Sequence, residues 1–199
     1  MTTATTPPGH PAVAAPDADA LHPLLGRRFS PRAFDPDATL TPDQLGRLLE
    51  AARWAPSASN TQPTRFLVGR RGDPTFAHLL AALMPPNRSW AGDASALVLL
   101  AAETVDPAAT GGTRRWAEYD AGQAAAHLTV QAGALGLAVR QMGGFAPNAL
   151  PALPAGVTPL AVLAVGVPLP VEAIPDGHPA HRLPARTRRP LDELLLRVA

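Results

Sequence analysis

Hydrophobic residues at helical spacing recur along most of the chain and predict several helices. The clearest begins at Thr41-Pro42-Asp43-Gln44, which forms a capping box with proline at the first helical position. Leucines and alanines then fall on one helical face until Pro56, where the pattern ends. We also expect a short helix over residues 21–26, a helix over 74–83 and a long alanine-rich helix over 116–135.

Between these helices lie short apolar runs that are typical of buried strands. The run from Ala96 to Ala102 is apolar throughout, so we expect it near the centre of a sheet. The other expected strands cover residues 65–69, 137–141 and 160–167. All of these runs are too short to span a bilayer. Helices interleaved with a few buried strands indicate an α+β or α/β fold.

The composition agrees with one globular domain over residues 21–199. The chain has 199 residues, of which 46% are hydrophobic and 17% charged, enough to bury a sizeable core. Residues 1–20 are rich in Thr, Pro and Ala and lack the charged and apolar regions of a signal peptide. We therefore expect a disordered extension there. The absence of cysteine is compatible with a reducing compartment, and we expect a cytoplasmic protein.

Missing residue types exclude several classes of chemistry. Without cysteine, the chain has no disulfides, thiolate nucleophiles or iron–sulfur clusters. Without lysine, it has no Schiff-base or P-loop lysine, so arginine, hydroxyls or backbone N–H groups must hold any ligand phosphate. The histidines show no metal-binding spacing and there is no GxGxxG pattern, so we expect neither a metal nor a Rossmann site. A net charge of +1 gives no reason to expect a nucleic-acid partner.

The segment from Pro56 to Pro63 joins the amphipathic helix to an apolar strand and carries uncharged polar groups. Two prolines stiffen its backbone, and serine, threonine, asparagine and glutamine side chains supply hydrogen-bond donors and acceptors. Such a loop suits a flat heterocycle with polar edges that needs hydrogen bonds but no buried counter-charge. Taken alone, the segment fits an ordinary helix-to-strand connection equally well.

A second polar segment has arginine or serine at alternate positions. In an extended backbone Arg28, Ser30 and Arg32 would point to one side and Phe29 to the other. One face could then offer two guanidinium groups and a hydroxyl to an anion. Taken alone, the segment is more typical of a solvated surface turn, and the pair Gly143-Gly144 is by itself typical of a turn.

Together and in this order, the motifs resemble those of the FMN-dependent nitroreductase family. The resemblance covers nearly everything from Arg27 to Leu195. It rests on Arg27-Arg28-Phe29-Ser30-Pro31-Arg32-Ala33-Phe34-Asp35, the Pro-Ser-x-x-Asn-x-Gln-Pro loop from Pro56, Asn87-Arg88-Ser89-Trp90, the helix over 116–135, Met142-Gly143-Gly144-Phe145 and Arg186-Thr187-Arg188-Arg189-Pro190-Leu191. It implies a three-layer α+β sandwich with a central, mostly antiparallel sheet flanked by helices. It also implies a homodimer, and the small side chains of the helix over 116–135 fit either a dimer contact or a buried core.

The resemblance implies an FMN site and assigns residues to its parts. Arg28 and Ser30 match ligands of the phosphate and ribityl chain, with Phe29 between them, and Arg186 and Arg188 match a phosphate clamp. Arg32 matches the basic residue beside flavin N1, where it would stabilise the reduced form. Trp90 stands where family members often place a second cation, which leaves Arg32 as the main stabilising charge.

The remaining assignments concern the flavin ring. Asn87 matches a ligand of the flavin edge, Gly143 and Gly144 match backbone beside N5, and Gln141 matches a backbone contact. Residues from the helix–strand loop match positions that reach the flavin across the dimer interface: Pro56, Ser57, Ala58, Asn60 and Gln62. No protein residue is expected to act as a catalytic acid or base, because solvent can supply the proton.

The resemblance implies oxidation of NADH or NADPH and reduction of a small acceptor, such as a nitroaromatic or a quinone, by a ping-pong mechanism. The acceptor, the nicotinamide preference and the biological role do not follow from these residues. A specialised flavin dehydrogenase of a biosynthetic intermediate, or a flavin-fragmenting relative, would share the same flavin contacts. A flavin-binding sensor or carrier without reductase activity is a third reading.

Overall fold

An antiparallel sheet forms the middle layer of the structure. The computed structural model describes residues 21–105, 112–184 and 186–196, so the extension expected over 1–20 lies outside the described residues. In spatial order the strands are β1 (Thr64–Arg70), β2 (Ala96–Glu103), β4 (Val157–Gly166) and β3 (Ala138–Met142). Each strand runs antiparallel to its neighbours in this sheet.

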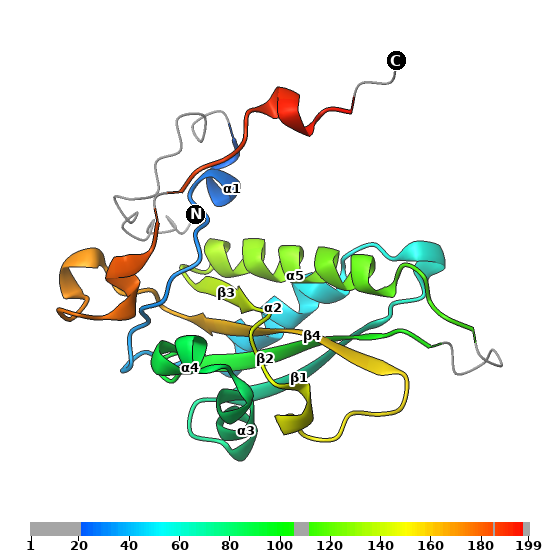
Figure 1. Cartoon of the computed structure of the whole chain (residues 1–199), viewed down its shortest axis with the longest axis horizontal. Helices are drawn as coiled ribbons and strands as arrows, with labels where there is room; N and C mark the ends of the chain where they lie inside the picture. The colour runs from blue at the N-terminus through cyan, green and yellow to red at the C-terminus, as the bar shows by residue number, and fades with distance from the viewer. Residues whose placement is uncertain (1–20, 106–111, 185, 197–199) are drawn as a thin grey trace.

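Helices cover both faces of this sheet (Figure 1). On one face lie α2 (Pro42–Arg53) and α5 (Ala117–Ala134), and on the other lie α3 (Pro74–Ala82) and α4 (Pro85–Ala91). The short helix α1 (Pro23–Gly26) contacts α5. Single 3₁₀ turns occur at Ala58–Asn60, Pro147–Ala149, Val171–Ala173, Pro179–Arg182 and Leu191–Leu194. The expected α+β sandwich with three layers is therefore confirmed.

β2 lies between β1 and β4, as its apolar sequence predicted. Val98, Leu100 and Ala102 belong to the core beneath α2 and α5, whereas Leu97 and Leu99 belong to the core beneath α3 and α4. Side chains alternate between the faces of a strand, and here both faces are covered. The strand therefore shows no polar alternation even though the sheet is antiparallel.

The start of α2 confirms the capping box. The Thr41 hydroxyl accepts a hydrogen bond from the Gln44 N–H at 3.1 Å, and the Gln44 side chain accepts one from the Thr41 N–H at 3.0 Å. The helix ends at Arg53, ahead of Pro56, so the loop from Pro56 onward begins at a defined point. The other predicted helices and strands also exist, with ends that differ by a few residues from the expected ones.

The sequence pattern did not predict α4, which has only seven residues and no room to show a helical period. Its first residues are Pro85 and Pro86, where a helix tolerates proline because the N–H group would be unpaired anyway. This helix matters for the site because it carries both Asn87 and Trp90.

No helix in the described ranges is both long enough and apolar enough to cross a membrane. The same ranges contain no cluster of three or more histidine, aspartate or glutamate residues that could hold a metal ion.

Candidate functional site

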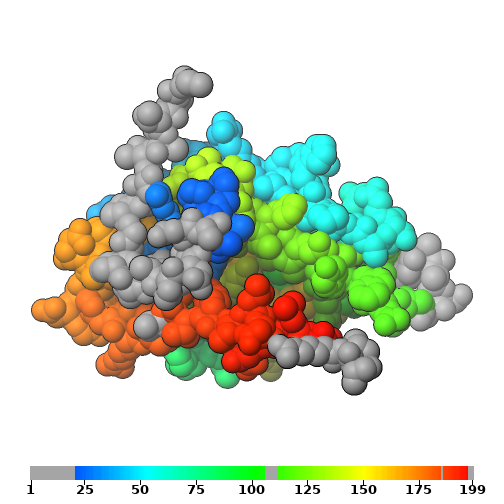
Figure 2. All heavy atoms as spheres, turned by 90° about the horizontal axis from the view of Figure 1, so that it is seen from above, coloured from blue at the N-terminus to red at the C-terminus, as the bar shows by residue number. Residues whose placement is uncertain are grey.

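Arginines from the two ends of the described chain meet beside α1. Nη1 of Arg186 donates to the carbonyl of Gly26 at 2.5 Å, across 160 positions of sequence, and Nη2 donates to that of Leu25 at 3.5 Å. Nη1 of Arg28, which follows α1, donates to the Ser30 hydroxyl at 3.2 Å. Figures 1 and 2 show the C-terminal segment running past α1 on the surface. The structure thus brings together Arg28, Ser30 and Arg186, which the family resemblance had assigned to the phosphate and ribityl part of the expected site.

The electrostatics of this group are unfavourable without an anion. Burial, and then the charges of Arg186 and Arg188, lower the pKa of the Arg28 guanidinium. Burial, and then Arg188, lower the pKa of Arg186. Among the described residues, none of the three makes an ion pair with a carboxylate. Three like charges lie close together, two of them partly buried, without a carboxylate partner among the described residues. Such a group suits an anion, and a phosphate is a good match for guanidinium groups.

A second pair of arginines lies at the other end of the same segment. Arg140 in β3 donates through Nη1 to the carbonyl of Ser30 at 2.6 Å. Burial, and then the charge of Arg32, lower the pKa of Arg140. The Nε of Arg32 is buried and makes no hydrogen bond within the described part of the chain. The backbone from Arg28 to Arg32 therefore carries cations at both ends, and the sequence analysis had missed Arg140.

Arg32 has a neighbouring cation, Arg140, although Trp90 stands at the position where a second cation was expected. This corrects the expectation from the sequence. Trp90 is 1% exposed, and its ring is stacked on that of Phe34 with centroids 6.3 Å apart. The guanidinium carbon of Arg140 lies 5.6 Å from the centroid of the Trp90 ring. Trp90 is thus a core residue of α4, and the cation near it comes from β3 instead.

Asn87 and the Gly143-Gly144 pair lie in contact, next to these residues. The side-chain amide of Asn87 donates to the carbonyl of Gly144 at 3.3 Å. A Cβ atom at Gly144 would lie 3.0 Å from the same amide, whereas one at Gly143 would meet no protein atom within 4 Å. Gly143 therefore borders open space, as a backbone position beside a ligand must. Gln141 is exposed, and its side chain donates to the Thr129 hydroxyl at 3.4 Å.

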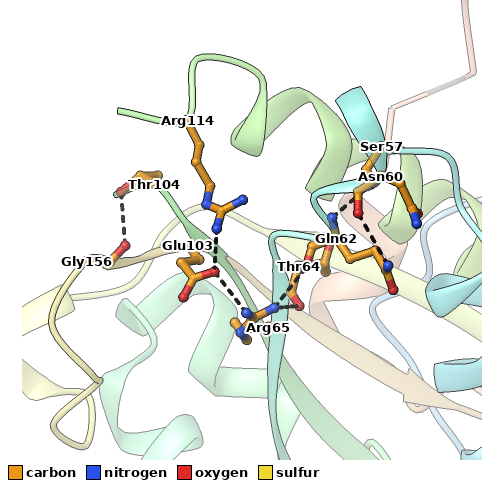
Figure 3. A network of polar contacts seen from close by, with 9 residues as sticks. All are labelled: Ser57, Asn60, Gln62, Thr64, Arg65, Glu103, Thr104, Arg114 and Gly156. Carbon is orange, nitrogen blue, oxygen red and sulfur yellow. Dashed lines mark hydrogen bonds and ion pairs between the residues drawn. The ribbon is translucent and has the colours of Figure 1, made fainter. Parts of the chain in front are cut away.

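The loop predicted to bind a heterocycle adopts an unusual backbone. Ser59, Asn60 and Gln62 have φ angles of 51°, 55° and 48°, in the left-handed region that non-glycine residues seldom occupy. Local hydrogen bonds hold this shape (Figure 3): the N–H of Gln62 donates to the Ser57 hydroxyl at 3.0 Å, and its side chain to the Asn60 carbonyl at 3.3 Å. Backbone strain of this kind tends to occur at functional sites.

Side chains from outside the loop fix its two ends. The carboxylate of Asp120, which is 3% exposed, accepts a hydrogen bond from the Ala58 N–H at 3.0 Å. Arg65 donates to the carbonyl of Gln62 at 2.9 Å and pairs with Glu103 at 2.9 Å (Figure 3). Arg114 lies 3.6 Å from the same carboxylate. The sequence analysis missed Asp120, although an acid within an alanine-rich, buried helix was the signal that could have identified it.

The predicted site residues nevertheless form two groups within one chain. Asp120, near the start of α5, holds the loop, while a Cβ at Gly133, near its end, would lie 3.6 Å from Leu24 of α1. At the rise of an α-helix, these two positions are roughly 20 Å apart. In Figure 1 the loop and α1 lie at opposite ends of α5. The loop and the Arg28 group are therefore distant in a single subunit.

Comparisons with known proteins agree with the fold and the motifs. The structure superposes on an oxidoreductase containing FMN with a TM-score of 0.78 and 30% identity, over 88% of this chain and 90% of the other. A candidate nitroreductase from Desulfovibrio desulfuricans in complex with FMN gives 0.69 and 28%, over 90% and 98%. An uncharacterised 15.4 kDa protein of Mycolicibacterium smegmatis is 41% identical over 112 residues, 51% of this chain and 74% of its own length. The model of the Nitroreductase family matches residues 25–167, and the chain belongs to that family.

Proposed function

We propose that the protein is an FMN-dependent oxidoreductase. The observation that carries this proposal is the group of Arg28, Arg186 and Arg188, which lacks a carboxylate partner among the described residues. The terminal phosphate of FMN supplies the charge that this group needs. The similar structures that contain FMN, at 30% and 28% identity, support the same cofactor.

The residues that would surround the flavin ring also fit this cofactor. Arg32 has an unpaired, buried Nε near Arg140, and Asn87 and Gly144 present polar groups beside the open space at Gly143. Bound FMN would supply the redox chemistry, accepting a hydride from NADH or NADPH and passing electrons to a small nitroaromatic, quinone or related acceptor. The protein would hold the phosphate, place positive charge at the polar edge and leave one approach to the ring open.

We expect the purified protein to release FMN, and no FAD, on denaturation. The reason is that the arginines would enclose a terminal phosphate, whereas an adenylate half would require a continuation of the site that the sequence does not show. Chromatography of the released flavin tests the cofactor. Anaerobic addition of NADH or NADPH, followed by a nitroaromatic or a quinone, tests the reaction through bleaching and recovery of the flavin absorbance. Recovery of FAD, or failure to take up added FMN, would contradict the proposal.

We further propose that the FMN site is shared between two subunits of a homodimer. The separation of roughly 20 Å along α5 keeps the loop of one chain away from its own Arg28 group. A second copy could bring its loop to that group, because isologous interfaces exchange equivalent surfaces. The side chains of three aromatic residues are exposed: Trp54 directly after α2, and Trp116 and Tyr119 at the start of α5, at 73%, 51% and 65%. Large exposed aromatic residues of this kind are enriched at interfaces.

Complementation between two defective chains tests the shared site. Arg28→Met would damage the anion group, and Asp120→Ala would release the loop at Ala58. Each variant alone should bind FMN weakly, whereas subunit exchange between them should restore one intact site in each mixed dimer. FMN titration of the two variants and of their mixture measures this, with sedimentation velocity to establish the dimer. A monomer that binds FMN tightly, or a mixture that binds no better than its components, would rule out the shared site.

A further inference from the structure

Arg140 is a charged residue in a position where the fold should favour an apolar one. It lies between Ala138 and Met142 on β3, and both of these neighbours on the same strand face belong to the core beneath α3 and α4. No ion pair among the described residues involves Arg140. A half-buried guanidinium without an acidic partner costs folding free energy, so its presence calls for a reason other than stability.

The contacts of Arg140 fix its place relative to the segment from Arg28 to Arg32. Its Nη1 donates to the carbonyl of Ser30, while the hydroxyl of Ser30 accepts from Arg28. Ser30 thus joins the arginine group beside α1 to the arginine of β3. The second arginine of the segment, Arg32, lies close enough for its charge to act on Arg140.

Trp90 holds the guanidinium of Arg140 on its other side. The guanidinium carbon is 5.6 Å from the ring centroid, within the range of a cation–π contact. The Trp90 ring cannot move away, because it is almost fully buried and stacks on Phe34. An aromatic residue on α4 and an arginine on β3 therefore form a matched pair, in which the first supports the second.

We propose that Arg140 provides, together with Arg32, the positive charge beside the pyrimidine edge of the bound flavin. The charge thus comes from the central sheet, while α4 contributes the aromatic support of Trp90. This role rests on the proposed FMN-dependent function. A reduced flavin gains negative charge at its N1 and O2 edge, so a second fixed cation in a partly buried site favours reduction.

A substitution that removes the charge but keeps a hydrogen-bond donor separates this role from a purely structural one. Arg140→Gln keeps a donor that can reach toward the Ser30 carbonyl but removes the charge. We expect reduced FMN to bind about tenfold more weakly relative to oxidised FMN, which lowers the two-electron midpoint potential by about 30 mV. Arg140→Lys keeps the charge and should retain a potential close to that of the wild type. The measurement is equilibration of the FMN-loaded protein with redox dyes under anaerobic conditions.

Arg88→Gln is the matched control, because Arg88 is an exposed arginine on α4 that donates to the Ala81 carbonyl at the helix surface. It removes the same charge from the same region and should leave the potential unchanged. If Arg140→Gln weakens oxidised and reduced FMN equally, Arg140 only positions the backbone at Ser30 and the proposal is wrong.

Two further outcomes are decisive. If Arg140→Gln folds too poorly to take up FMN, the midpoint potential of FMN bound to Arg140→Lys decides. A lowered potential in this variant, which retains the charge, would overturn the proposal, and an unchanged potential would support it. If the wild-type protein takes up no FMN, the proposed function and this role fail together. Uptake of FMN with an unchanged potential in Arg140→Gln refutes the role of Arg140 alone.

Discussion

Arg28→Met is expected to weaken FMN binding by about 30- to 100-fold, which corresponds to about 2–3 kcal/mol for the loss of a charge-assisted contact. In the FMN-free protein the same change should leave the free energy of unfolding unchanged or slightly raise it. Methionine preserves most of the apolar stem of the side chain. The substitution removes the charge of the Arg28 guanidinium, whose pKa is already lowered by burial and by Arg186 and Arg188. Titration of flavin fluorescence and urea unfolding of the FMN-free protein measure the two effects.

Arg27→Met provides the control, because Arg27 is the exposed neighbour of Arg28 at the end of α1. It changes the net charge by the same amount and should affect neither quantity strongly. Inorganic phosphate adds a second readout: it should stabilise the FMN-free wild type more than Arg28→Met, since a ligand that binds the native state raises its stability. If Arg28→Met destabilises the FMN-free protein by more than about 2 kcal/mol, Arg28 is a structural residue and the anion site is misplaced.

Arg28→Met is expected to weaken FMN binding without lowering the stability of the FMN-free protein. Both expectations follow from the electrostatics of the region. Arg28 lies near Arg186, and Arg140 lies near Arg32 at the other end of the same segment. No ion pair among the described residues neutralises either pair. The folded protein therefore stores repulsion that an anionic ligand relieves. Binding free energy and folding free energy are coupled through these side chains, so ligand-free stability is a useful control for every variant at this site.

The sequence sufficed for those features that depend on local pattern. β2 was predictable because a strand buried on both faces is apolar at every position, and the capping box of α2 is encoded within four adjacent residues. The grouping of Arg28 with Arg186 was predictable only through the family resemblance. The two residues lie close in space but near opposite ends of the domain's sequence, and no local sequence pattern indicates a contact between such distant positions.

The features that sequence reasoning missed depend on contacts between distant residues. Arg140 reaches Ser30 across 110 positions, and Asp120 reaches Ala58 across 62. Both are charged residues on the mostly apolar, buried faces of their elements, and that placement was the signal. The left-handed backbone at Ser59 and Gln62 was also hidden, because turn prediction looks for glycine at such positions and these residues are not glycine.

Gly69→Ala is expected to destabilise the fold by more than about 4 kcal/mol, an effect that belongs to the extreme range for single substitutions. A Cβ atom at this position of β1 would lie 2.3 Å from the amide nitrogen of Phe76, 2.5 Å from its Cα and 2.8 Å from the carbonyl carbon of Thr75. These atoms belong to the backbone of the first turn of α3, so no side-chain rotation can relieve the clash. Separation of α3 from β1 would in turn open the core that contains Phe76 and Leu79.

The first turn of α3 cannot easily move away from β1, because the Asp73 side chain is hydrogen-bonded to both elements. One carboxylate oxygen of Asp73 accepts from the N–H of Phe76 at 2.7 Å and the other from the N–H of Arg70 at 2.8 Å. Gly46→Ala is the control: Gly46 is exposed within α2, a Cβ there would meet no atom within 4 Å, and alanine should stabilise the helix by about 0.5–1 kcal/mol. Urea unfolding followed by circular dichroism compares the two variants. A Gly69→Ala protein within about 1 kcal/mol of the wild type would show that α3 can shift away from the sheet at little cost, contrary to the close packing of protein interiors.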